Sequence, residues 1–291
     1  MKQLFILIGL CAGLHSLAQM KPADRILYGK ITPDSLLQSP YDSWFKKNYD
    51  SYAVNPSIEN ALEKMSLKGI SMEVYFGSWC GDSKRELPRF LKLLDQINFD
   101  KRNLAIVALG GSDSLYKQSP QGQEKAKGIF KVPVFIVYKN GVEINRINEF
   151  PVQTLERDLL SILQREDYSA NYHSFSTVSK WLEQGALADS NVSVRGLMNQ
   201  LKPLVMDEHE LNSIGYLLLK QQKIKEALVI FRINAGIFPE SANTLSSLGE
   251  AYLETGDKQK AISYLERSLG FERSTAVTQE ILSLLYKANR L

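Results

Sequence analysis

A junction between a strand-like run and a helical pattern constrains the fold of this 291-residue chain more than any other feature. Residues 72–76 form a short apolar run of the length of a strand, and the segment Trp79-Cys80-Gly81-Asp82-Ser83 follows it. Apolar residues then recur at the spacing of a helix that buries one face: Leu87, Phe90, Leu91 and Leu94. The sequence therefore predicts a strand, a short loop with a cysteine, and a helix.

The cysteine stands where such a strand gives way to its helix. The first N–H groups of a helix have no partner within the helix, and they favour a negative charge beside them. Cys80 is therefore placed to act as a nucleophile. Three residues further on, where a dithiol motif has its second cysteine, the chain has Ser83. A serine cannot form a disulfide.

The segment around Cys80 resembles the active-site motif of the thioredoxin superfamily. Trp79, Cys80 and Gly81 match the start of a thioredoxin site, and Pro88 falls where thioredoxins kink their first long helix. Pro133, within residues 128–141, resembles the cis-proline that faces the cysteine in that family. The resemblance covers roughly residues 60–165. It implies Cys80 as the catalytic nucleophile with Ser83 in place of the resolving cysteine, and substrate contacts at Trp79, Gly81, Asp82, Val132 and Pro133.

Periodicity supports the same fold without the resemblance. Residues 103–109 are nearly all apolar, as expected of a strand buried on both faces. Residues 134–138 form another strand-like run, and Asn140-Gly141 is a strong hairpin signal before the return strand. A helix is expected to open at Pro151-Val152 and to continue to Leu163. We expect an α/β thioredoxin-like domain, with a central mixed sheet flanked by helices.

The sequence departs from the thioredoxin pattern at the position of a buried carboxylate. Thioredoxins have a buried carboxylate six residues before the first cysteine, where this chain has Val74. Glu73 is adjacent, but strand alternation points it to the other face. The resolving thiol and its proton acceptor are thus missing together. This argues against a dithiol reductase and leaves single-thiol chemistry open.

The first residues read as a secretory signal peptide. Lys2 is followed by the apolar residues 4–14, and Ser16 and Ala18 supply small side chains at the −3 and −1 positions. We expect cleavage after Ala18 and a periplasmic or secreted protein. Cleavage would remove Cys11 and leave Cys80 as the single thiol. After cleavage no stretch is apolar enough to span a membrane. The net charge of +3, without a basic cluster, gives no sign of nucleic-acid binding.

A second pattern follows the thioredoxin-like part. Small and apolar residues recur at an interval of 34 in the pairs Gly215/Gly249, Ala227/Ala261, Leu218/Tyr252 and Phe231/Leu265. This interval resembles the tetratricopeptide repeat, and Pro239 closes the first unit as in that family. Arg273 takes the equivalent position in the second unit, and residues 275–291 read as a capping helix. We expect an all-α C-terminal array that binds a protein or peptide.

The expected organisation has five segments: a signal peptide (1–18), an N-terminal helical segment packed on the sheet (19–68), the thioredoxin-like domain (69–166), a helical linker (167–206) and tetratricopeptide repeats with a capping helix (207–291). Within the domain, residues 116–127 read as an insertion around a helix.

Other candidate chemistry is sparse. His15 lies in the signal, while His173 and His209 lie outside the thioredoxin-like part, and no Cys/His pair has the spacing of metal ligands. No metal or cofactor is therefore indicated. Asp82 either opposes a thiolate at Cys80 or stabilises the helix N-terminus as a first-turn acid, and we favour the second interpretation.

Two functions remain open. The first is single-thiol exchange with protein thiols or disulfides, suited to isomerisation or the removal of a thiol cap, on substrates held partly by the repeats. The second is a redox-silent binding module built from the same two parts. Iron–sulfur binding by a single-thiol glutaredoxin-like site is a weaker third idea, because the glutathione-contact motifs of that family are lacking.

Overall fold

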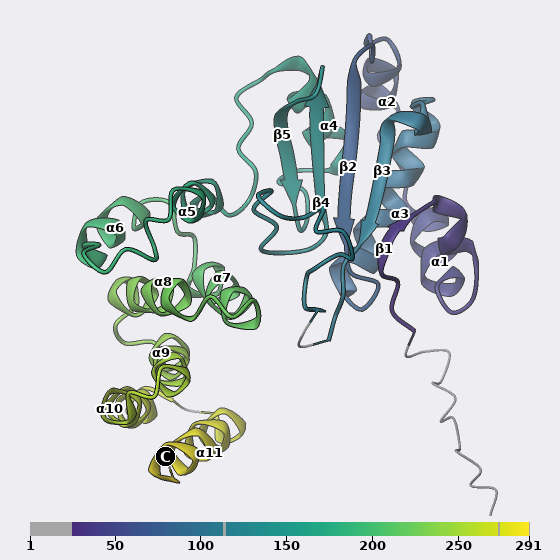
Figure 1. Cartoon of the computed structure of the whole chain (residues 1–291). Helices are drawn as coiled ribbons and strands as arrows, with labels where there is room; N and C mark the ends of the chain where they lie inside the picture. The colour runs from purple at the N-terminus through teal and green to yellow at the C-terminus, as the bar shows by residue number, and fades with distance from the viewer. Residues whose placement is uncertain (1–24, 113–114, 273, 291) are drawn as a thin grey trace, which may run out of the picture.

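The structure is a computed structural model that describes residues 25–112, 115–272 and 274–290 (Figure 1). Within these residues, a mixed α/β part with one five-stranded sheet precedes a helix-rich C-terminal part. The expected signal peptide, Cys11, His15 and Arg273 lie outside the described residues. No helix within the described ranges is long and apolar enough to cross a bilayer.

The sheet has the strand order β1-β3-β2-β4-β5. Its strands are β1 (Gly29–Ile31), β2 (Ile70–Phe76), β3 (Leu104–Ala108), β4 (Val134–Lys139) and β5 (Val142–Asn148). β2 and β3 are parallel, and the other neighbouring pairs are antiparallel. Asn140 and Gly141 both take positive φ between β4 and β5, which confirms the hairpin.

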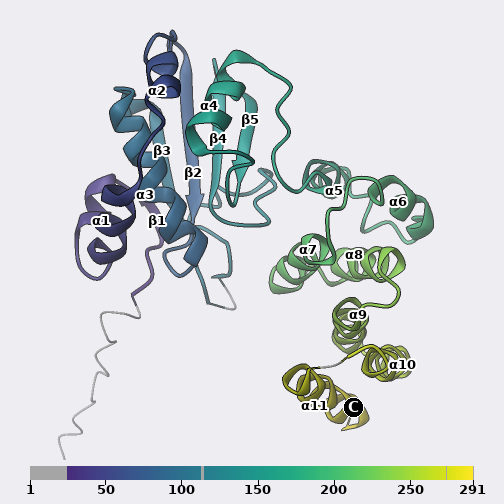
Figure 2. The same cartoon turned by 180° about the vertical axis from the view of Figure 1, so that it is seen from behind.

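Helices cover one face of the sheet, as Figure 2 shows. They are α1 (Asp42–Ser51), α2 (Pro56–Glu63), α3 (Gly81–Gln96) and α4 (Leu155–Gln164). The core between this layer and the sheet takes Val74 and Phe76 from β2, and the Phe90 ring of α3 lies 4.3 Å from the Phe135 ring. Alternation along β2 sends Glu73 and Tyr75 to the opposite face.

The N-terminal segment contains more than the expected helices. α1 and α2 are present, but β1 pairs antiparallel with the free edge of β3 and a 3₁₀ turn follows at Pro33–Leu37. No sequence pattern predicts β1, because a strand of three residues is too short to display alternation. Its partner on β3 lies far away in the sequence.

The expected helix within residues 116–127 is absent, and this prediction is wrong. The segment forms successive turns. Lys117 and Ala126 take positive φ, as does Gly122, and a helix cannot pass through such positions. Pro120 also lacks the N–H that a helix interior needs.

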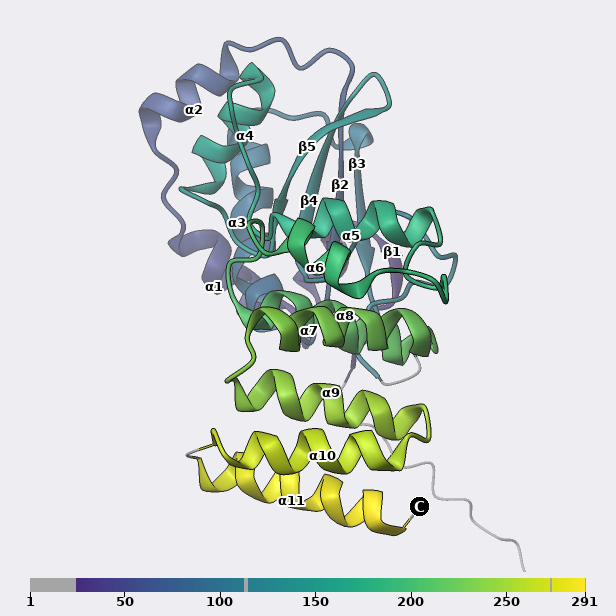
Figure 3. The same ribbon diagram turned by 90° about the vertical axis from the view of Figure 1, so that its left-hand side faces the viewer.

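The C-terminal part is a stack of helices, seen in Figure 3. It contains α5 (Ser174–Glu183), α6 (Val194–Leu201), α7 (Glu208–Lys220), α8 (Ile224–Ile237), α9 (Ala242–Glu254), α10 (Lys258–Leu269) and α11 (Thr275–Arg290). A Cβ atom at Gly215 would lie 2.5 Å from the Phe231 ring, and one at Gly249 would lie 2.7 Å from Leu265. The interval of 34 therefore marks the same close helix crossing made twice.

Candidate functional site

Cys80 is the N-cap residue of α3, with extended backbone angles and a half-buried side chain. Its thiol donates a hydrogen bond to the Val132 carbonyl oxygen, at an Sγ–O distance of 3.3 Å. The Val132–Pro133 peptide bond is cis. The structure therefore brings together three residues that the sequence analysis selected from segments fifty residues apart.

Trp79 is held in one orientation beside the cysteine. Its indole N–H donates to the Leu109 carbonyl at 3.0 Å. A Cβ atom at Gly77 or Gly111 would lie 2.6 or 2.5 Å from the indole ring, so both positions require glycine. The centre of the Tyr116 ring lies 5.4 Å from the centre of the indole ring. Trp79 is thus held in place by contacts from residue 77, residues 109–111 and residue 116.

The rim of the site is more open. A Cβ atom added at Gly81 would meet nothing within 4 Å, so the surface next to Cys80 has room for another chain. Asp82 forms an ion pair with Arg85 at 2.8 Å, and both side chains are substantially exposed. This geometry fits the interpretation of Asp82 as a first-turn acid.

Ser83 is completely buried, and its hydroxyl oxygen accepts a hydrogen bond from the Gly77 N–H at 3.1 Å. The serine therefore fastens the loop before Cys80 to the first turn of α3. Val74 is also fully buried in the core, so no carboxylate lies at that position.

Glu73 lies on the face of β2 opposite Val74, and it belongs to a polar cluster with Tyr75 and Tyr138. Its carboxylate accepts hydrogen bonds from Lys127 at 2.5 Å, Tyr75 at 2.8 Å and Tyr138 at 3.1 Å. Burial raises the pKa of Glu73, but these hydrogen bonds and the Lys127 charge outweigh it and lower the pKa overall.

Sequence reasoning missed Lys117. This lysine is only 6% exposed, and its ammonium donates to the Phe130 carbonyl at 2.5 Å. Burial lowers the pKa of Lys117 to about 8, and the charge of Lys131 adds to this effect. A single lysine in a turn-rich segment carries no sequence signal. Its burial depends on helices a hundred residues away.

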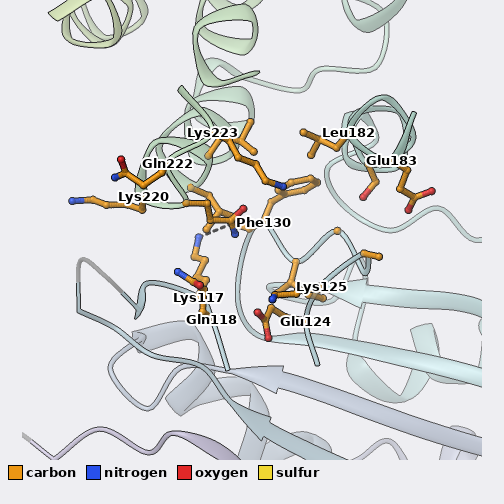
Figure 4. Close-up of a pocket in the computed structure, with 17 residues that line it drawn as sticks. Lys117, Gln118, Glu124, Lys125, Phe130, Leu182, Glu183, Lys220, Gln222 and Lys223 are labelled. Atoms are coloured by element: carbon orange, nitrogen blue, oxygen red, sulfur yellow. Dashed lines mark hydrogen bonds between the residues drawn. The ribbon is translucent and has the colours of Figure 1, made fainter. Parts of the chain in front are cut away.

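Two cavities flank this lysine. Figure 4 shows a cavity of about 640 Å³ between residues 117–130 and the helices α5 and α7, with the Lys117–Phe130 hydrogen bond inside it. A second cavity of about 520 Å³ lies between Gly111, Tyr116 and Lys117 on one side and α7 and α9 on the other. His209 lines this second cavity, whereas His173 lines a separate one. Lys117 and Lys220 border both of the flanking cavities.

Comparisons with known proteins find no matching family model and no matching curated protein. In the part of the chain that the structure describes, no group of His, Cys, Asp and Glu is arranged to hold a metal ion. The function is therefore argued from the geometry around Cys80.

Proposed function

We propose that this chain is an exported single-thiol exchange protein, with a thioredoxin-like domain at residues 69–166 and a tetratricopeptide-like array at residues 207–291. The strand order around β2 and the cis bond before Pro133 support the first assignment. The repeated helix crossings at Gly215 and Gly249 support the second. The signal-like residues 1–18 support export to the periplasm or beyond.

One observation carries the proposal: the Cys80 thiol lies against the Val132 carbonyl, beside cis-Pro133 and next to the open surface at Gly81. In the reaction, the Cys80 thiolate bonds to one sulfur of a substrate disulfide, and the other sulfur leaves as a thiolate. A second thiolate, from the substrate or a small thiol, then attacks the mixed disulfide and releases Cys80. No electrons are gained or lost overall, which suits isomerisation or the removal of a thiol cap.

The test is direct trapping of the mixed disulfide. The mature full-length protein is incubated with glutathione disulfide and its intact mass is measured. We expect one glutathione per chain, no adduct on Cys80→Ala, and an unchanged adduct on Ser83→Ala. An unmodified wild-type protein would refute the exchange reaction.

The burial of Ser83 favours a second candidate, the redox-silent binding module. Its hydroxyl is committed to the Gly77 N–H, and Val74 is packed in the core, so the residues for a second redox step have become structural. In that case Cys80→Ala would leave the capture of protein partners from cells unchanged. Under the exchange proposal, the same substitution removes the disulfide-linked partners.

A further inference from the structure

Lys117 carries an unusually buried positive charge. Lys117 is the only lysine or arginine that is buried within the described residues. Its φ of 53° also places a non-glycine residue in the left-handed region. Desolvated charge and strained backbone both oppose folding, and they gather at functional sites. In this protein the buried charge and the strained backbone both belong to Lys117.

Lys117 and Cys80 are attached to the same short segment. The Lys117 ammonium bonds to the Phe130 carbonyl and the Cys80 thiol bonds to the Val132 carbonyl, two residues further along. A second connection runs through aromatic rings. The Lys117 Nζ lies 4.9 Å from the centre of the Tyr116 ring, which in turn packs on Trp79. Burial and the Lys131 charge lower the pKa of Lys117, whereas Glu149 and Cys80 act in the opposite direction. Burial raises the pKa of Tyr116, and the nearby Cys80 adds to this effect.

Among the described residues, no carboxylate forms an ion pair with this ammonium. Glu149 is already paired with Lys131 at 3.0 Å and also accepts a hydrogen bond from the Tyr172 hydroxyl. On the other side of Cys80, Asp82 is paired with Arg85. The titratable groups that face Lys117 or share its cavities are Cys80, Tyr116, Glu124, Lys125, Lys131, Glu149, Glu183, His209, Tyr216, Lys220 and Lys223.

Lys117 borders two cavities, yet the lysine is only 6% exposed. Leu217 of α7 and Leu182 of α5 line the first of these cavities together with Lys117, and Figure 4 draws Leu182 on the side away from Lys117. A charge in such surroundings acts on its neighbours more strongly than one in bulk water. The low exposure of the ammonium therefore strengthens its effect on the Cys80 site.

We propose that Lys117 is a positioning residue for Cys80, whose buried ammonium stabilises the Cys80 thiolate through its charge. In disulfide exchange, which rests on the proposed function, the same charge stabilises the thiolate that leaves the substrate. That leaving thiolate keeps the electron pair of the broken S–S bond and takes its proton from water. Lys117 acts by charge and does not bond to either sulfur.

The test measures the rate at which iodoacetamide alkylates Cys80 in the mature full-length protein, and it requires no disulfide substrate. Lys117→Gln keeps a donor for the Phe130 carbonyl but removes the charge. At about pH 7 we expect the rate to fall on the order of tenfold. Lys117→Arg keeps the charge and should keep the rate. Lys125→Met removes a charge from an exposed side chain of the same segment and should match wild type.

The pH profile separates a charge effect from a structural one. The pKa of Lys117 is about 8, so its charge is lost in wild type as the pH rises above that value. The difference between wild type and Lys117→Gln should therefore disappear at about pH 10. A variant whose loop changed the access of iodoacetamide to the sulfur would still differ from wild type at about pH 10, where the thiol is ionised in both proteins. Lys117→Met, which fills the site with an apolar chain, replaces the Gln variant if that one does not fold.

The outcomes distinguish the two proposals. Equal alkylation of wild type and Lys117→Gln at about pH 7, with a reactive thiol in both, would overturn the role of Lys117 and leave the exchange function standing. A slow Lys117→Arg would also overturn it, because charge would then not be the cause. A reactive, Lys117-dependent thiol that forms no mixed disulfide would instead refute the exchange function alone.

Discussion

The α/β part and the helical part of this protein are held together in different ways. In the sheet, β2 pairs with β3 and β4, and β1 pairs with β3, so the strands depend on partners distant in sequence. In the helical part, α7 to α11 pack mainly on their neighbours in the chain. Damage to the sheet should therefore be global, whereas damage to the helices should stay local.

The two parts nevertheless meet where residues 116 and 130 contact the core of the helical part. Phe130, two residues before the Val132 carbonyl that binds Cys80, packs its ring 5.0 Å from Phe175 of α5. Tyr116 also packs against the core of the helical part. The segment that carries the site is thus shared, and the contrast between global and local damage can be tested through Cys80.

The largest effect is expected from Phe90→Ala. The Phe90 side chain is fully buried between α3 and the sheet, against Phe135. Its removal should destabilise the α/β part by about 3–5 kcal/mol, through lost burial and the cavity left behind. Thermal unfolding followed by Cys80 alkylation should show early exposure of the thiol. An unchanged melting temperature would show that the sheet core is not the cooperative unit.

Gly249→Val should have a smaller and more local effect. A Cβ atom there meets Leu265 at 2.7 Å and the Ala261 carbonyl at 3.3 Å, so α9 and α10 must move apart. We expect a loss of about 1–3 kcal/mol in the helical part. The alkylation rate of Cys80 should stay at the wild-type value. A changed rate would contradict the expectation of local damage, because a perturbation between α9 and α10 would then have altered the surroundings of Cys80.

Features that depend on local sequence patterns could be predicted from the sequence, whereas features that depend on distant segments could not. The β2–α3 junction, the hairpin at Asn140 and the 34-residue interval depend on local patterns, and the structure contains the strands, turn and crossings they predict. β1 depends on an edge offered by β3, and Tyr116, next to Lys117, packs against the core of the helical part. Such features exist only after distant segments meet, so no local pattern predicts them.

Ser83→Cys tests whether the site keeps a geometry suited to two thiols. The substitution weakens the hydrogen bond from the Gly77 N–H, at a cost of about 1 kcal/mol. Residue 83 lies one helical turn from Cys80, so we expect some dithiol-dependent reduction of insulin, which the wild type should lack. Turnover should be slow, because Val74 leaves no buried carboxylate to accept a proton.

The control for this variant is the double variant Cys80→Ala, Ser83→Cys, which should be inactive. If the single variant also fails to reduce insulin while Cys80 remains alkylatable, residue 83 is held out of reach of Cys80. The burial of Ser83 would then be purely structural, as the binding-module alternative requires.

The smallest effect is expected at Glu73, on the sheet face that bears the Cys80 site. Its folded pKa is lowered: burial opposes the shift, but the hydrogen bond from Lys127 leads the contributions that outweigh it. A lowered folded pKa means that the carboxylate adds stability above its ordinary pKa of 4.5 and loses it as the pH falls through the folded value. Glu73→Gln should therefore cost under about 1 kcal/mol at neutral pH and flatten this part of the acid-unfolding profile.

Glu63→Gln supplies the matched control for that measurement. It removes the same charge from an exposed position at the end of α2, away from the Lys127 cluster. Chemical denaturation at a series of pH values should show the flattened acid limb for Glu73→Gln and the wild-type limb for Glu63→Gln. If both variants keep the wild-type limb, the ion pair at 2.5 Å between Lys127 and Glu73 contributes nothing to stability. The polar cluster would then matter only for the shape of the sheet face beside Cys80.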